Sequence, residues 1–351
     1  MKLSIILTIL LLSLQETPVA PEQPATAPLA AGNSAAATES STVIATDTDT
    51  DTDTGVAAQP AAQTWTMRYQ FHPGQQLRYQ SKQQMTLEAQ VGENQRVDVS
   101  QVRQIRRYAV SETTGDLSRL SMQFEDVWMH RQVDQEPPVE FRSSMKPGEV
   151  PEVFRNVAHS LRGAAPIFQI TSVGRAVAAQ AEPAKPQKSV ASPVDSAPEA
   201  KSGEKSVADV SPRSGGADPG SFLMLLPETP VSAGGTWKEE FLVQVRGGQD
   251  LQLPVQILRT YRLESVENGI AKVTFRSSVR TPLRGTVVRS QLIQATPSGS
   301  FLLDLKRGLM VRREFRWNET VIGALGPESI LASHGNQTDE LLEEAAEPVA
   351  N

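Results

Sequence analysis

Acid–base and metal chemistry would have to come from a small set of side chains in this chain of 351 residues. Its histidines are His72, His130, His159 and His334. No two of them have the spacing that places two metal ligands on one face of a strand or helix. Two pairs of adjacent acids, Glu125-Asp126 and Glu239-Glu240, fall in segments that alternate like strands. Strand neighbours point to opposite faces, so neither pair is expected to form a two-carboxylate site by itself.

Motifs of the common enzyme classes are missing from the sequence. There is no Gly-x-Ser-x-Gly, no phosphate-binding glycine loop and no His-Glu-x-x-His. The chain has no cysteine, which excludes disulfides, thiolate metal ligands, a cysteine nucleophile and a lipid-modified N-terminal cysteine. We therefore predict that the protein is not an enzyme, and we assign it no catalytic residue, no metal ligand, no cofactor and no named ligand-binding residue.

Aromatic side chains are the remaining candidates for a binding surface. The tryptophans are Trp65, Trp128, Trp237 and Trp317, and side chains of this type line sugar- and lipid-binding surfaces. Trp237 and Trp317 share the strand parity of apolar neighbours, which favours packing in the core. The sequons Asn318-Glu319-Thr320 and Asn336-Gln337-Thr338 match the N-glycosylation pattern, a match that is frequent by chance.

The first residues indicate export. Met1-Lys2 is a short basic start, and the run from Leu3 to Leu14 is apolar apart from Ser and Thr. Such a run fits a signal peptide, expected here as residues 1–20, and is shorter than the ~20 residues needed to span a bilayer. The alternative is a short uncleaved anchor. We predict a protein of the periplasm, cell envelope or extracellular space with no stable transmembrane span.

Two low-complexity segments divide the rest of the chain. Residues 21–63 are rich in Ala, Pro, Thr and Asp and contain a strict Thr-Asp alternation from Thr46 to Thr54, which is typical of a solvated spacer. Residues 179–220 form a second tract rich in Ala, Pro, Lys, Ser and Gly, which predicts a disordered insert. Residues 336–351 are expected to be an acidic tail.

The charge is distributed unevenly. The net charge is −6, yet residues 64–178 carry 14 Lys and Arg against 12 Asp and Glu, and residues 221–320 carry 14 against 9. This excess of arginine either covers a solvated strand face or attracts an anionic envelope polymer or lipid headgroups. Dense basic runs with interleaved aromatic residues are absent from the sequence, so no nucleic-acid partner is predicted.

Residues 64–178 and 221–335 both have the alternation of half-buried strands. Apolar residues of one parity include Leu77, Tyr79, Met85, Leu87, Val273, Phe275, Phe301 and Leu303. Turn signals separate these runs, namely Pro73-Gly74, Gly115-Asp116, Gly247-Gly248, Asn268-Gly269, Ser298-Gly299 and Arg307-Gly308. Sequential strands joined by short turns predict antiparallel sheet.

One helix is expected from Glu149 to Arg162. Its apolar residues recur on one face, namely Val150, Val153, Phe154, Val157, Ala158 and Leu161. Pro151 suits the first turn and Gly163 suits the end. His159 lies on the opposite face, which argues against a metal or catalytic role for it.

Three motifs carry a resemblance to a known family. Pro73-Gly74-Gln75-Gln76-Leu77-Arg78-Tyr79 opens the first half, the segment from Leu226 to Trp237 opens the second, and the segment from Gly299 to Leu309 follows near the end. In this order they resemble an uncharacterised family of exported β-rich bacterial proteins of the planctomycete type. The resemblance implies export and architecture only, and its motif residues are expected to form turns and core.

The fold predicted from these patterns is mainly β. The preferred architecture is a curved antiparallel sheet or half-barrel with one packed helix, as in periplasmic lipoprotein carriers, and the alternative is two β-sandwich domains. The first function hypothesis is a non-enzymatic envelope protein that binds a lipid or other apolar or amphiphilic ligand in the curved sheet. The second is a structural or interaction protein of the envelope without a ligand, and hydrolase activity ranks last.

Overall fold

The computed structural model describes residues 63–163, 165–177, 223–246 and 252–342. The expected signal peptide, the second low-complexity segment, the end of the chain and all of the first low-complexity segment except residue 63 lie outside these ranges. The strands of the first half are β1 (Thr64–Trp65), β2 (Gln76–Val91), β3 (Asn94–Thr114), β4 (Leu117–Val133), β5 (Val139–Arg142), β6 (Ile167–Thr171) and β7 (Ala176–Val177). Those of the second half are β8 (Val231–Ser232), β9 (Thr236–Arg246), β10 (Gln252–Glu267), β11 (Ile270–Val279), β12 (Ser298–Asp304), β13 (Leu309–Ile322) and β14 (Ser329–Leu342).

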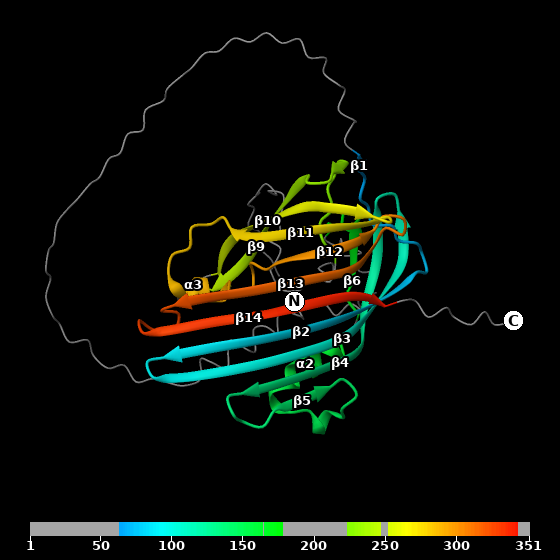
Figure 1. Ribbon diagram of the computed structural model, residues 1–351. Coiled ribbons are helices and arrows are strands. Elements are labelled where there is room, and N and C mark those ends of the chain that lie inside the picture. The colour runs from blue at the N-terminus through cyan, green and yellow to red at the C-terminus, as the bar shows by residue number, and fades with distance from the viewer. Residues whose placement is uncertain (1–62, 164, 178–222, 247–251, 343–351) are drawn as a thin grey trace, which may run out of the picture.

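A single open antiparallel sheet joins the two halves of the sequence (Figure 1). Its order is β7-β6-β4-β3-β2-β14-β13-β12-β11-β10-β9, with β5 also on β4, and β1 pairs with β8 apart from it. The halves meet where β14 pairs with β2, from Ser329 opposite Val91 to Leu342 opposite Arg78. The predicted curved antiparallel sheet is confirmed and the two-sandwich alternative is wrong. Residues 336–342, expected as tail, belong to β14.

The turn chemistry follows the sequence at most of the expected sites. Asn268 and Gly269 both have positive φ, 53° and 82°, as a tight two-residue hairpin between β10 and β11 requires. The expected turn at Ser298-Gly299 is wrong, because β12 begins at Ser298 and Gly299 lies within it. A Cβ at Gly299 would meet the Phe275 ring at 2.8 Å and the Glu314 carbonyl, so glycine is needed here for close packing. Gly247-Gly248 lies outside the described residues.

One face of the sheet carries all the apolar clusters. The largest lies under two inner segments that are not part of the sheet, residues 66–73 and 223–226, whose Met67, Tyr69 and Met224 are buried on the strands. Three smaller clusters lie farther along the same face. Because alternate residues of each strand share this face, the period-two pattern in the sequence marks the core directly.

The predicted helix is present but shorter than expected. Residues 147–149 and 152–154 are 3₁₀ turns, and the α-helix proper is α2, Arg155–Leu161. Its apolar face is buried on β3, β4 and β5, with the rings of Phe154 and Phe141 5.8 Å apart. His159 is exposed, as expected from its place on the opposite face. The sequence did not predict α3 (Thr286–Gln291), which connects β11 to β12 and is followed by buried Leu292 and Ile293.

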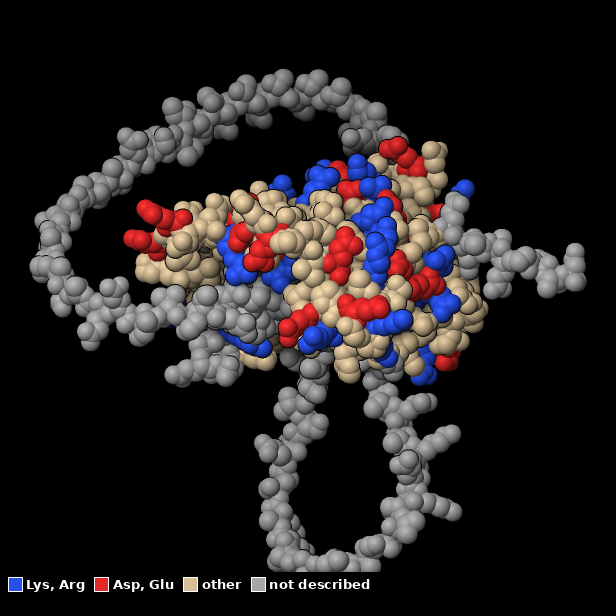
Figure 2. Space-filling view, turned by 90° about the horizontal axis from the view of Figure 1, so that it is seen from below, with Lys and Arg blue, Asp and Glu red and all other residues tan. Residues whose placement is uncertain are grey.

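Charged residues cover the outer face of the sheet. Lys and Arg are interspersed with Asp and Glu on the side of the molecule seen in Figure 2. Arg312, for example, contacts both Glu314 and Glu340, and Arg78 contacts Glu125. Such exposed pairs contribute little each, which agrees with a solvated face. Among the described residues, the helices are all too short or too polar to cross a bilayer.

Candidate functional site

The outer edge of β4 is only partly covered. β6 pairs with its first residues, Leu117–Ser121, and β5 with a later part, Trp128–Arg131. Between them, the described residues provide no strand partner on this edge. At the same place the β3–β4 register shifts, so that Phe124 faces Arg106 and Asp126 faces Ile105. Glu125 is therefore the extra residue of a β-bulge, a feature that redirects side chains at a sheet edge.

A cleft of about 340 Å³ opens at this gap. Its lining residues come from the bulge of β4, from β5 and the turn after it, and from α2: Phe124, Glu125, Asp126, Phe141, Ser143, Ser144, Ala158, Leu161 and Arg162. In Figure 1, β5 lies below β4 at this edge of the sheet. The volume is at the low end of the range of ~300–1,000 Å³ for small-molecule sites.

The cleft has an apolar interior wall. Phe141 and Ala158 are buried, and Phe124 and Leu161 are partly buried against the same cluster. Phe124 also packs against the large cluster beneath the inner segments, so it stands between the two parts of the core. This wall offers aromatic and aliphatic surface to a ligand.

The mouth of the cleft is polar. Some of its side chains are already held by ion pairs or hydrogen bonds within the protein, and others are not. Glu125 contacts Arg78 at 2.8 Å and Arg107 at 3.6 Å on the outer face. The Ser143 hydroxyl accepts a bond from the Val127 N–H at 3.0 Å and donates to Asp126 at 3.5 Å.

The exposed guanidinium of Arg162 makes no ion pair within the described part of the chain. The mouth of the cleft thus carries a carboxylate at Asp126 and a cation at Arg162, neither neutralised by a close partner of opposite charge. Both remain free to contact a polar ligand group.

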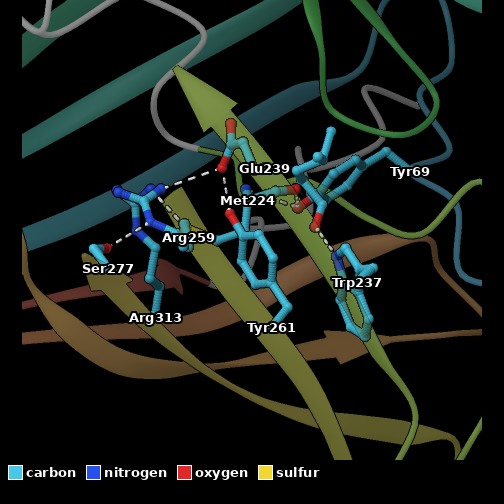
Figure 3. A network of polar contacts seen from close by, with 9 residues as sticks. Tyr69, Met224, Trp237, Glu239, Arg259, Tyr261, Ser277 and Arg313 are labelled. Carbon is cyan, nitrogen blue, oxygen red and sulfur yellow. Dashed lines mark hydrogen bonds and ion pairs between the residues drawn. The ribbon is translucent and has the colours of Figure 1, made fainter. Parts of the chain in front are cut away.

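The inner segments, in contrast, are fastened to the sheet by a closed polar network (Figure 3). The Tyr69 hydroxyl donates to the Met224 carbonyl at 2.9 Å and accepts from the Met224 N–H at 3.1 Å. The Trp237 indole N–H donates to the Leu225 carbonyl at 2.8 Å. Burial raises the pKa of the Tyr69 hydroxyl, which keeps it protonated as a donor. This network fastens one inner segment to the other and to the sheet through buried and partly buried groups.

Glu239, Arg259 and Tyr261 form a second part of that network on β9 and β10 (Figure 3). The Tyr261 hydroxyl donates to Glu239 at 2.6 Å, and the Arg259 guanidinium lies 3.5 Å from the same carboxylate and donates to Ser277 at 3.2 Å. Arg259 also lies over the Phe241 ring, 5.0 Å from its centroid. Glu239 points inward while Glu240 bonds Gln256 on the outside, so the expected separation of this acidic pair is confirmed.

The most deeply buried charges lie where β13, β14, β2 and β3 meet. Arg313 donates to Asp339 through Nε at 3.0 Å and Nη2 at 2.7 Å. Burial acts to raise the pKa of the Asp339 carboxyl, but the charges of Arg313 and Arg106 outweigh it and hold the pKa below its ordinary value. Arg106 is buried close by, and its Nε and the Gln104 Oε1 have no hydrogen-bond partner in the described structure.

The sequence did not predict the cleft. Glu125 and Asp126 were expected on opposite faces, yet both line the cleft, because the bulge breaks the alternation on which that expectation rested.

The tryptophans have structural positions. Trp237 packs against the core as predicted, stacked on Tyr261 with the ring centroids 5.3 Å apart. Trp317 lies against Gly335, where an added Cβ would clash with the indole. Among the described residues, the histidines and acids form no metal-binding cluster.

The motif residues that carry the family resemblance have structural positions. Gly74 takes a positive φ of 83° in the turn before β2, and Tyr79 is buried. Asp304 accepts bonds from the N–H groups of Lys306 and Arg307 at 2.9 and 3.0 Å, which fixes the turn between β12 and β13. None of these residues lines the cleft.

Comparison with known proteins adds little. No family model matches the chain and no curated protein matches it, so the resemblance to exported planctomycete-type proteins stays a prediction. Among solved structures, one described as "Lipid-protein interactions in lipovitellin" is similar with a TM-score of 0.40 and 9% identity, over 80% of this chain and 26% of that chain. At this level the similarity carries no inference about function.

Proposed function

We propose that the protein is an exported, non-enzymatic binding protein of the cell envelope that holds an amphiphilic ligand in the cleft between β4, β5 and α2. Its localisation is proposed from the basic start and apolar run of residues 1–14. The observation that carries the binding function is the lining of the cleft, which is apolar inside and polar at the mouth.

The two parts of the lining match the two parts of an amphiphile. An acyl or similar chain lies against Phe124, Phe141 and Leu161, where its burial is worth about 0.8 kcal/mol per methylene. The polar head stays at the mouth with Ser143, Ser144 and Arg162, where it remains hydrated in part. The ligand therefore enters the edge of the curved sheet and not the space beneath the inner segments.

Binding of a fluorescent fatty-acid analogue to the full mature chain tests this function. Ser144 is exposed at the mouth, so Ser144→Trp fills the cleft without disturbing the core. Ser278→Trp is the matched control, because Ser278 is an exposed strand residue far from the cleft lining. We expect saturable binding to the wild type, at least tenfold weaker binding to Ser144→Trp and unchanged binding to Ser278→Trp.

Two results would count against the proposal. If the wild type does not bind the analogue, or if both variants bind it as the wild type does, the cleft is not the site. Circular dichroism and thermal unfolding of both variants establish that each is folded before binding is compared.

The second candidate function is that of a structural or interaction protein without a ligand. It is favoured by the inner segments, which cover the largest apolar cluster with buried residues such as Met67 and Leu226. Native mass spectrometry of protein purified from its own host separates the two. A co-purifying amphiphile supports ligand binding, and its absence together with a failed titration supports the structural function.

A further inference from the structure

Exposed apolar side chains gather at one end of the sheet. Nine large hydrophobic residues are exposed in the described part of the chain, and five of them lie at this end: Val91, Val287, Ile322, Leu325 and Ile330. Ile322 is 69% exposed, Val287 57% and Leu325 41%. Single exposed apolar residues are ordinary, but a cluster of them on a soluble surface marks an interaction site. We call Val287, Ile322 and Leu325 the tip patch.

The tip patch is held in a defined shape. The Thr286 hydroxyl at the start of α3 donates to the Gly323 carbonyl in the β13–β14 turn at 2.7 Å. The Leu325 N–H donates to the Ser329 hydroxyl at 2.8 Å, which fixes the other side of that turn. α3 thus lies beside the turn at the left end of the sheet in Figure 1. The apolar side chains project from a fixed frame of turn and short helix.

Basic residues flank the tip patch. Arg284 and Arg289 are exposed on either side of Val287, and Arg246 is tied to α3 by two backbone bonds with the Gln291 amide, both 2.7 Å. These three arginines make no ion pair within the described residues. Two acids also lie at this end, Glu328 in the β13–β14 turn and Glu93 in the adjoining β2–β3 turn, so the three arginines leave a small excess of positive charge.

We propose that this end of the sheet docks on an anionic lipid bilayer. The tip patch would enter the boundary between headgroups and acyl chains, and the arginines would contact lipid phosphates. A second copy of the chain fits less well, because a two-fold contact would bring the same unpaired arginines together. Docking here leaves the cleft beside β4 exposed, and it does not depend on what that cleft binds.

Flotation of the full mature chain with lipid vesicles tests the docking surface. The vesicles are phosphatidylcholine alone and phosphatidylcholine with phosphatidylglycerol. We expect binding to the second kind only, weakened by added salt because exposed charges are screened. Ile322→Ser combined with Val287→Ser should weaken binding at least tenfold. Ile167→Ser is the matched control, since Ile167 is 53% exposed but lies on β6, and it should bind as the wild type does.

The arginines are tested separately. Arg284→Ser with Arg289→Ser should remove the preference for anionic vesicles while leaving the protein folded, because both side chains are exposed. The proposal is overturned if the wild type floats with neither kind of vesicle, or if Ile167→Ser weakens binding as much as the tip variants. It is also overturned if sedimentation shows that the tip variants abolish a dimer and leave vesicle binding unchanged.

Discussion

The same face of one sheet is sealed in one region and left partly open in another. Beneath residues 66–73 and 223–226 the face is sealed, because these inner segments bury Tyr69 and Met224 and bond their polar groups to each other and to the sheet. Beside β4 the face is covered only by the short α2, and the cleft remains. The two regions differ in the segments that cover the sheet: two inner segments cover the first, and the short α2 covers the second.

This contrast gives the buried polar groups different consequences. In the sealed region, Arg313 and Asp339 form an ion pair that is buried away from water. Removing one of them leaves an unpaired buried charge, which lowers the free energy of unfolding. At the cleft, Asp126 and Arg162 are close to solvent, so changing either is expected to affect the fold little. Changes to the buried charges of the sealed region are therefore expected to lower stability, and changes to the charges at the cleft are expected to leave it nearly unchanged.

The largest expected effect is that of Arg313→Met. It leaves Asp339, which is 4% exposed, without the two hydrogen bonds that the buried Arg313 guanidinium donates to its Oδ2. Breaking a buried pair in this way costs about 3–5 kcal/mol of unfolding free energy, measurable by urea denaturation. Arg313→Met with Asp339→Leu should recover most of the loss. A single variant as stable as the wild type would show that the pair is unimportant.

Phe154→Ala tests how firmly α2 and the 3₁₀ turn before it, which contains Phe154, pack on the sheet beside the cleft. Phe154 is buried against Phe141 and does not line the cleft, so a loss of about 3–5 kcal/mol is expected from the cavity it leaves. His159→Ala on the exposed side of α2, which directly follows the 3₁₀ turn of Phe154, should stay within about 0.5 kcal/mol of the wild type. If Phe154→Ala were equally harmless, α2 would not be part of the core.

The same substitution at two leucines compares the regions directly. Leu226 in an inner segment is 1% exposed, and Leu226→Ala should cost about 2–5 kcal/mol. Leu161 borders the cleft, so part of its surface is already free and Leu161→Ala should cost less than about 2 kcal/mol. Only Leu161→Ala should weaken binding of a fluorescent amphiphile. Equal losses of stability at both positions would mean that the cleft is closed in solution.

Much of the fold could be predicted because strand alternation reports burial. Leu77 and Tyr79 are core residues as their parity indicates, Asn268-Gly269 makes the hairpin its chemistry requires, and Phe154 packs as the helical spacing predicts. Each of these depends on a local pattern.

The candidate site could not be predicted, because it depends on tertiary structure. The bulge at Glu125 is set by the pairing of β4 with β3, and nothing in the local sequence marks an extra residue there. The inner segments cross the sheet without forming its strands, so no periodicity reveals them. Arg313 shares the strand parity of Phe315, which packs against the core, but alternation alone does not indicate that a charged residue there is buried beside Asp339.

The smallest expected effect is a pH dependence that belongs to the sealed region. The pKa of the Asp339 carboxyl is held below its ordinary value in the folded chain, so its ionised form is favoured by folding. Its contribution is complete above the unfolded-state value of about 3.9 and is lost as the pH falls through the lower folded-state value. One proton changes stability by at most about 1.4 kcal/mol per pH unit.

Urea denaturation at a series of acidic pH values measures this contribution. The variant with Arg313→Met and Asp339→Leu lacks the titrating group and should lose stability less steeply than the wild type below about pH 4. Glu267→Gln removes an exposed carboxylate that makes no ion pair within the described structure, and it should follow the wild type. Equal slopes for the double variant and the wild type would contradict the assignment. The charge of Asp339 would then be as accessible to water as the groups at the cleft, and the contrast between the two regions would fail.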